Sequence, residues 1–374
     1  MGESKNIPIK NLFYMLCYAW DILDIKDDIR GGCDNCTNVY DLLARIFTYG
    51  IGKLIKGGFN RSYIERIDEL STLRGKIDIP HSILSISSNR HAMFCSYDEY
   101  SEDNLFNGIL KYTLEFLIIN TAISQETKNL IREQLGFFIN IKSIAPKKYE
   151  RKRIRFNQNN KIYVLLINIA VLIYDEMLAT EEDGENTFKD FLREKQMHRV
   201  FELFILNFYK KHLDSNYYDV SAPHIEWPLD LDVKVKELWC DFDVQDKLTA
   251  RRTDVSINTR RDSKLNWQCI IDAKYYQSTF VGGYMNDYDE RVRTAHINQI
   301  RGYLLDSKFE GFKVGALIYP LVARDLGRGY LYPLKDAPAI VKTINLNRDW
   351  GDIEKDLLSF IKKIGDSVRR MPKI

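Results

Sequence analysis

The sequence predicts a two-domain α/β protein (α+β overall), in which a mixed helix and short-strand half precedes a half with longer strands. Three observations support this prediction. The chain has 374 residues, more than one ordinary core accommodates. Apolar residues recur at both helical and strand-like spacings. An acidic stretch without apolar periodicity, residues 179–189, separates the two halves. We therefore predict domains at residues 1–187 and 188–374.

The first half contains several segments with clear patterns. Helices are expected where apolar residues share one face: 8–23, 39–54, a helix capped by 101–104 and continuing to about 119, 125–135 and 161–178. Between the second and third helices the pattern changes to short strands at 63–67, 75–79, 83–86 and about 91–97.

The second half begins with a long helix over residues 188–213. Strand-like segments follow at 239–244, 253–257, 268–276 and 314–319, and a helix at 293–305 lies between the last two. This alternation of strands and helices is what an α/β core requires.

The composition limits the classes of function. The 54 Lys and Arg residues nearly balance the 52 Asp and Glu residues, so any nucleic-acid surface must be local. Of the six cysteines only Cys33 and Cys36 form a close pair, which is too few for a structural zinc site. The N-terminus lacks the apolar core of a signal peptide, and the longest apolar run, 163–174, is too short to span a bilayer. We expect a cytoplasmic protein without a membrane partner.

The most informative segment is an apolar strand, residues 269–276, that ends in two charges. Side chains alternate along a strand, so Asp272 and Lys274 project to one side and Ile271, Ala273 and Tyr275 to the other. Charges at the end of an apolar strand are costly unless they are paired. Such a break in the local pattern often marks a functional site.

The preceding strand, 253–257, adds a second carboxylate. Antiparallel pairing through the hairpin loop 258–266 would bring Asp254 beside Asp272. Two carboxylates and the backbone carbonyl of Ala273 suit Mg²⁺. The metal would activate water and neutralise charge on a scissile phosphate, and Lys274 would orient that water or stabilise the transition state. This D…D-x-K order is the core of the PD-(D/E)xK nuclease fold, whereas a surface Asp–Lys pair is the structural alternative.

Two further features favour the nuclease interpretation. Gln299 and Tyr303 lie four residues apart, on one face of the helix that follows the D-x-K strand. They could hold the DNA backbone or the lysine, although an ordinary amphipathic helix has the same pattern. Glu202 stands in an apolar stretch of the long helix, from which it could reach the metal or face solvent.

Basic residues gather in two places. Near the predicted site are Arg251, Arg252, Arg260, Arg261, Arg291 and Arg293, which would contact phosphates without reading sequence. A second run, residues 147–155, could follow DNA or face an acidic partner, and a solvated loop is the alternative.

Several motifs together resemble the McrC family, the nuclease subunits of McrBC modification-dependent restriction systems. They are I-P-I-K-N-L-F-Y-M-L at residues 7–16, Y-A-W at 18–20, R-G-K-I at 74–77, E-D-N-L at 102–105, T-D at 253–254, I-D-A-K-Y-Y at 271–276 and I-Y-P at 318–320. The resemblance places the catalytic residues at Asp254, Asp272 and Lys274. The chain departs from it in a longer hairpin loop and in A-R-R at 250–252.

The resemblance implies a partner, an McrB-like GTPase ring of the AAA+ type that recognises methylated DNA. The chain itself lacks a phosphate-binding G-x-x-x-x-G-K-[ST] loop, so no nucleotide site is expected. The first half would dock on the ring through residues 61–86, with Arg74 and Lys76 beside a turn at Gly75, and a plain exposed hairpin is the alternative for this segment. Double-stranded DNA would be cut by two copies that meet through the nuclease half. A non-enzymatic adaptor of the ring and a free-standing repair or RNA nuclease are the alternatives.

Overall fold

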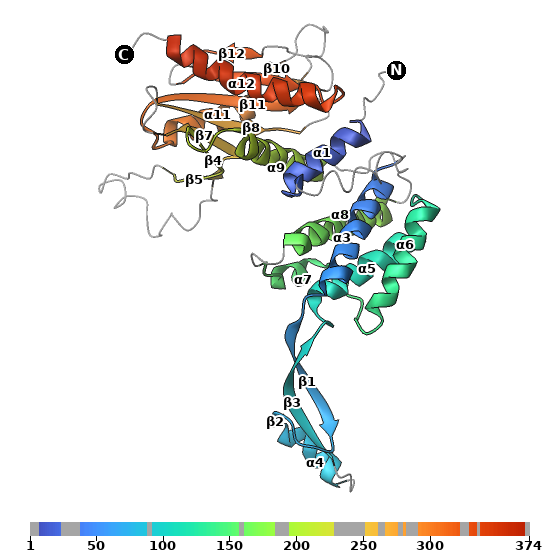
Figure 1. Cartoon of the computed structure of the whole chain (residues 1–374). Helices are drawn as coiled ribbons and strands as arrows, with labels where there is room; N and C mark the ends of the chain where they lie inside the picture. The colour runs from blue at the N-terminus through green and yellow to red at the C-terminus, as the bar shows by residue number, and fades with distance from the viewer. Residues whose placement is uncertain are drawn as a thin grey trace, which may run out of the picture. The chain divides into compact units, whose positions relative to one another are not determined.

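The computed structural model describes residues 7–23, 38–87, 92–156, 161–183, 194–227, 251–260, 266–275, 280–281, 291–321, 329–334 and 337–370. The chain forms two compact units, each considered by itself (Figure 1). The sheet unit comprises Met1–Lys26 and Leu192–Ile374, and the finger unit comprises Asp27–Phe191. The finger unit is therefore an insertion between the first helix and the rest of the sheet unit.

The sheet unit is built on one mixed sheet. Among the described residues its strands follow the order β12-β13-β11-β8-β7-β4. The central strands β8, β11 and β13 run parallel, and the outer pairs are antiparallel. The bounds of these strands are β4 Tyr218–Ser221, β7 Val255–Thr259, β8 Trp267–Ala273, β11 Phe312–Pro320, β12 Tyr330–Tyr332 and β13 Ala339–Ile344. Short ladders join β5 (His224–Ile225) with β6 (Arg251–Arg252) and β9 (Phe280–Val281) with β10 (Arg291–Val292).

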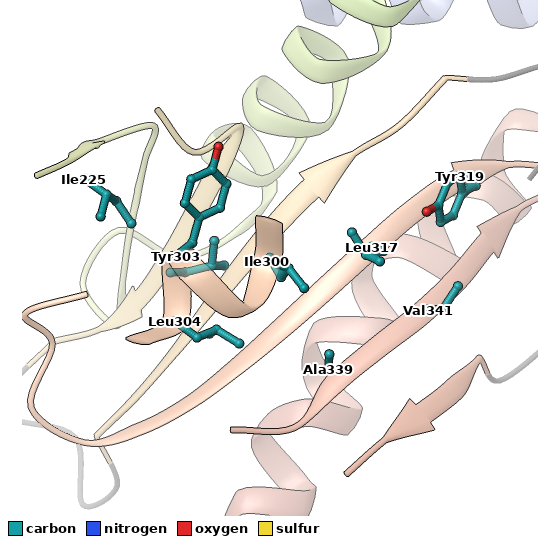
Figure 2. Close-up of a cluster of buried hydrophobic side chains, with 9 residues drawn as sticks. Ile225, Ile300, Tyr303, Leu304, Leu317, Tyr319, Ala339 and Val341 are labelled. Carbon is teal, nitrogen blue, oxygen red and sulfur yellow. The ribbon is translucent and has the colours of Figure 1, made fainter. Parts of the chain in front are cut away.

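Helices cover both faces of this sheet. Helix α11 (Thr294–Asp306) covers one face, while α9 (Glu194–His212) and α12 (Trp350–Arg370) lie on the opposite one (Figure 2). Every residue of β8 is buried, which explains its nearly continuous apolar sequence.

The core beneath α11 joins that helix to the central strands. Ile300, Tyr303 and Leu304 of the helix pack with Ile270 of β8 and with buried residues of β11 and β13 (Figure 2). Gly315 permits the close approach, because a Cβ there would lie 2.6 Å from the Ile300 side chain. This packing sets the distance between α11 and the sheet.

Helix α1 (Ile9–Ala19) completes the sheet unit from the far end of the sequence. The Asn11 amide donates to the carbonyls of Leu346 and Arg348 at 2.7 and 2.8 Å. The Tyr14 ring stacks on Trp350 with centroids 4.8 Å apart, and the Tyr18 hydroxyl lies 2.7 Å from Nε2 of His212. The N-terminal motif therefore holds α9 and α12 together.

The finger unit consists of a helical bundle and a long hairpin. The bundle contains α3 (Val39–Gly57), α5 (Leu105–Ile119), α6 (Gln125–Leu135), the short helices η2 (Gly136–Phe138) and α7 (Lys148–Arg153), and α8 (Lys161–Asp183). Asn38, Asn104 and Ser124 cap α3, α5 and α6 by accepting backbone hydrogen bonds.

The hairpin, here called the finger, extends from this bundle (Figure 1). Strands β1 (Ser62–Leu70) and β3 (Met93–Ser101) pair antiparallel over nine residues, about 30 Å. The short strand β2 (Lys76–Ile77) adds to β3, and α4 (Ile79–Ser87) packs at the tip. Gly75 adopts a left-handed φ of 68°, and a Cβ there would lie 2.4 Å from the Ser96 carbonyl oxygen.

Two predictions require correction. Residues 1–26 belong with the C-terminal segment, because α1 packs on α9 and α12, whereas the predicted first domain ran from 1 to 187. Residues 83–86 are helical, although their apolar content suggested a strand. Asp78 caps this helix, accepting from the His81 backbone N–H at 3.3 Å, and Pro80 favours its first turn. The predicted strand at 239–244, the Cys33–Cys36 pair and the boundary at 187/188 lie outside the described residues.

Most of the remaining predicted elements occur within a few residues of the expected bounds. Elements that the sequence did not predict include β4, β12 and β13 of the main sheet and the helices α7 and α12. Within the described parts of the chain, no helix is both long and apolar enough to cross a membrane.

Candidate active site

The hairpin of β7 and β8 brings the predicted carboxylates together. Val255 pairs with Ile271 in antiparallel register, which places Asp254, just before β7, opposite Asp272. Oδ2 of Asp254 accepts the backbone N–H of Ala273 at 2.8 Å. The predicted pairing is thus present, and one hydrogen bond orients the Asp254 carboxylate toward the end of β8.

Asp272 and Lys274 lie on the same side of the chain, as the strand alternation predicted. The Lys274 ammonium lies 2.9 Å from Oδ2 of Asp272, and the two side chains are only 10% and 1% exposed. Tyr275 points to the opposite side, where its ring meets Phe201 of α9. A surface Asp–Lys pair is therefore excluded, because both groups are buried.

Asp254 and Asp272 both have raised pKa values. Burial, followed by the charges of Asp272 and Glu202, raises the pKa of Asp254 to about 8. Burial also raises the pKa of Asp272, although the Lys274 ammonium opposes that effect. Neighbouring carboxylates that hold protons so tightly form a site where a cation would relieve both repulsion and desolvation.

Glu202 of α9 contributes to this field without a direct bond to either aspartate in the described structure. Its charge raises the pKa of both Asp254 and Asp272. Its Oε1 lies 2.6 Å from Nδ1 of His198, one helical turn earlier. The Glu202 side chain is 28% exposed, so it is partly accessible to solvent while its charge acts on both aspartates.

Gln299 and Tyr303 of α11 share a face, as predicted from their spacing. The Gln299 amide donates to the Tyr303 hydroxyl at 2.9 Å, and that hydroxyl donates to the Arg252 carbonyl at 3.1 Å. Burial raises the pKa of Tyr303, and the nearby charges of Asp272 and Asp254 also raise it. The pair therefore ties α11 to the segment that carries Asp254.

Two histidines near Lys274, His296 and His198, were not predicted from the sequence as part of the site. His296 of α11 is buried, and its Nδ1 lies 2.7 Å from the Tyr319 hydroxyl. Burial and the charges of Lys274, Arg293 and His198 lower the pKa of His296 to about 4, so it is neutral near pH 7. A lone histidine on an amphipathic helix carries little signal. His198 could have been noticed, because it lies four residues before Glu202.

The predicted cluster of basic residues does not act as one group. Arg251 forms an ion pair with Asp306 at 2.6 Å and lies over the Trp227 ring at 3.8 Å, which assigns it a structural role. Arg252, Arg260 and Arg293 are exposed. Arg261 and the side chain of Arg291 lie outside the description.

The donor set fits a hard cation. Among the described residues, Oδ2 of Asp272 is buried and meets Lys274 as an ion pair, without another hydrogen-bonding partner. In the same residues no group of three or more His, Cys, Asp or Glu side chains forms a complete metal site. Two carboxylates would need a backbone carbonyl such as that of Ala273, and water, to hold Mg²⁺.

The other predicted functional residues lie in the finger unit. Arg74 and Lys76 are exposed on either side of Gly75 at the finger tip, and Arg74 lies 4.3 Å from the centre of the Tyr97 ring. Residues 148–153 of the basic run form α7, where Arg151 pairs with Asp175 and Arg153 pairs with Glu150. Part of that run is therefore neutralised within the unit.

Known proteins resemble the whole chain. Residues 2–320 match the family described as McrBC 5-methylcytosine restriction system component. The chain is 26% identical over 363 residues to the Type IV methyl-directed restriction enzyme EcoKMcrBC of Escherichia coli (strain K12), covering 95% of this chain and 97% of that relative.

A solved structure shares the fold. It is a refined half-complex from a tetradecameric assembly of Thermococcus gammatolerans McrB AAA+ hexamers with bound McrC. The likeness has a TM-score of 0.52 at 16% identity and covers 96% of this chain and 76% of that chain. These matches confirm the resemblance that the sequence motifs predicted. Because the family match spans most of its length, the chain belongs to the family of McrBC 5-methylcytosine restriction system components.

Proposed function

We propose that this chain is the DNA-cutting subunit of a modification-dependent restriction system, a Mg²⁺-dependent endonuclease of the PD-(D/E)xK type. The observation that carries the proposal is the convergence of Asp254, Asp272 and Lys274 at the buried end of β8. An adaptor that only bound its partner would gain nothing from burying two facing carboxylates, since each costs desolvation energy.

Each of the three side chains has a defined task in this proposal. Asp254, Asp272 and the Ala273 carbonyl would hold Mg²⁺, which supplies a Lewis acid that activates water and neutralises charge on the scissile phosphate. Lys274 directs its ammonium at the same point and stabilises the negative charge that develops in the transition state. The Asp254 carboxylate keeps its orientation through the Ala273 N–H.

The surrounding residues support this arrangement. Gln299 and Tyr303 hold the strand that precedes Asp254 through the Arg252 carbonyl, so they position the site from α11. Glu202 adds negative field from α9, which favours a bound cation over a free pair of aspartates. His296 is neutral near pH 7, so it adds no second positive charge beside Lys274.

We also propose that the chain works with an McrB-like AAA+ ring that hydrolyses GTP. The structurally similar assembly contains McrB AAA+ hexamers with bound McrC. The finger, with exposed Arg74 and Lys76 at its tip, has the slender form that docking into a ring requires. In this proposal the partner selects the modified DNA, and two copies of the sheet unit meet to cut both strands of double-stranded DNA.

The test separates cutting from partner activation. Asp272→Asn and Lys274→Met keep side-chain size and should each lower double-stranded DNA cleavage by at least about a thousandfold. Stimulation of the ring's GTPase should stay unchanged. Asp219→Asn, an exposed carboxylate on β4, is the matched control and should cut normally. Full Mg²⁺-dependent cleavage by Asp272→Asn would refute the assignment.

Two alternatives have distinct outcomes in the same experiment. A non-enzymatic adaptor would stimulate the ring's GTPase, while the unaltered chain with the ring would leave DNA intact. A free-standing repair or RNA nuclease would cut without the ring and would lose that activity in Asp272→Asn. The proposal requires cleavage that depends on Asp272, on Mg²⁺ and on the ring with GTP.

A further inference from the structure

Two carboxylates oppose each other on the finger. The register of β1 and β3 places Glu65 directly across from Asp98, so the side chains share a face and lie next to each other. Both are exposed, and no described cation forms an ion pair with either. Like charges in this position destabilise a strand pair. The finger's own folding does not account for the pair.

Apolar groups border this pair along the same face. Tyr63 and Tyr100 oppose each other on the side toward the bundle, with ring centroids 5.1 Å apart, and are 74% and 57% exposed. On the side toward the tip, Ile67 is 52% exposed. Glu65 accepts a hydrogen bond from the Ser96 hydroxyl at 2.6 Å, which restricts its rotation. We call this surface the acidic notch: Tyr63, Glu65, Ile67, Asp98 and Tyr100.

The opposite face of the same strands is satisfied internally. Arg66 pairs with Glu99 at 2.5 Å, and the Tyr97 hydroxyl donates to Asp68 at 2.9 Å. Arg74 covers the Tyr97 ring. One face of the finger therefore neutralises its own charges, whereas the acidic notch does not.

The negative charge of the finger limits which kind of molecule can bind the acidic notch. The three strands of the finger's sheet carry five carboxylates, Glu65, Asp68, Glu69, Asp98 and Glu99, against Arg66 and Lys76, a net charge of −3. Phosphates would be repelled, which argues against DNA along this surface. The notch of a second copy would also be repelled. A cationic protein side chain with apolar neighbours is complementary in both charge and polarity.

We propose that the acidic notch receives an arginine of the GTPase ring, whose guanidinium bridges Glu65 and Asp98 and stacks on the tyrosine pair. Arginine suits this position better than lysine, because its planar group can bond two carboxylates and lie on aromatic rings at the same time. The inference rests on the proposed function, in which the finger docks on the ring. It adds the chemistry of the contact: a basic residue, flanked by apolar atoms, on the ring surface that meets β1 and β3.

The test uses the full chain and the GTPase ring of the same restriction system. The double variant Glu65→Gln/Asp98→Asn keeps shape and removes the repulsion, so its melting temperature should be unchanged or raised. Its affinity for the ring should fall about tenfold, and the salt dependence of binding should weaken. Glu133→Gln/Glu310→Gln, which removes two exposed carboxylates elsewhere, is the matched control and should bind like the unaltered chain.

The outcomes distinguish this inference from the proposed partnership. If the unaltered chain binds the ring and the notch variant binds equally well, the inference is wrong and the partnership stands. If the unaltered chain fails to bind, the partnership itself fails and the inference with it. A photo-crosslinking residue at Ile67 gives an independent result. The captured ring peptide should contain an arginine, whereas capture of DNA or of a second copy would overturn the proposal.

Discussion

Removal of α1 should unfold the sheet unit, although α1 lies more than 170 residues before the rest of that unit. The predicted domain 188–374, produced alone, would lose Tyr14 from its stack on Trp350 and Tyr18 from its contacts with Phe204 and Phe208. It would also lose the Asn11 amide that satisfies two carbonyls of the loop before α12.

The magnitude follows from the buried rings. Tyr14 and Tyr18 are 7% and 3% exposed. An aromatic side chain buries about 150–250 Å². At about 25 cal/mol per Å² the two rings together contribute about 8 to 12 kcal/mol, an upper estimate. Domains of this size are stable by about 5 to 15 kcal/mol. Loss of α1 therefore removes most or all of the unit's stability.

The assay compares two shortened chains. The first is residues 188–374. In the second, a Gly/Ser linker of about 12 residues replaces residues 24–193 and keeps α1. The Asn207 amide donates to the Tyr18 carbonyl, so the linker must span about 20 Å back along α9 to its first residue. Such a linker has an average span of about 17 to 21 Å.

Thermal melts followed by circular dichroism give the result. The linked chain should melt in one cooperative transition, and residues 188–374 should show none. If residues 188–374 melted cooperatively within a few degrees of the linked chain, α1 would contribute little and the reasoning from buried rings would be refuted. A linked variant with Asn11→Ala should melt lower than its parent, because two carbonyls lose their donor.

Three further predictions concern the site and its support. The pKa of Asp254 is raised to about 8, so protons compete with the cation below that pH. Apparent Mg²⁺ affinity, measured by isothermal titration, should rise about tenfold per pH unit from 6 to 8 and then level. The stability of the metal-free protein should change with pH in the opposite direction. Protonated Asp254 stabilises the fold fully below about pH 4, and this stabilisation is lost as the pH rises through about 8. Thermal melts in EDTA would detect the change. Tyr303→Phe removes the hydroxyl that accepts from Gln299 and should cost about 1 kcal/mol and slow cleavage; an unchanged cleavage rate would exclude a positioning role. Gly315→Ala should cost about 1 to 3 kcal/mol in denaturant melts, because its methyl group meets Ile300, and equal stability would indicate that α11 can shift.

The candidate site of Asp254, Asp272 and Lys274 could be predicted because its geometry is local. Alternation along one strand places Asp272 and Lys274 on one side, and a hairpin places Asp254 opposite. The contact between Gln299 and Tyr303 could likewise be predicted, because residues four apart share one face of a helix. Each of these relations depends on a spacing of fewer than about 20 residues and on the regular geometry of one element.

The remainder depends on contacts that no local pattern encodes. Asn11 bonds a carbonyl 335 residues away, so nothing near α1 shows that it belongs to the second half. The low pKa of His296 depends on its burial and on Lys274, which follows β8, and its hydrogen-bonding partner Tyr319 lies on β11. Residues 83–86 have the composition of a strand. They are helical because Asp78 caps the helix that contains them and Pro80 favours its first turn.

The contact between Asn11 and Leu346 has a consequence for synthesis. Helix α1 emerges first, yet its binding surface is completed only after Leu346 and Trp350 have been made. At about 5 to 20 residues per second this wait lasts roughly 15 to 70 s, during which the apolar side chains of α1 need shelter from aggregation. The finger unit, whose sequence is continuous, can fold meanwhile. A nascent chain released early would therefore carry a folded finger unit, while Asp254, Asp272 and Lys274 would belong to a sheet unit that has not yet assembled.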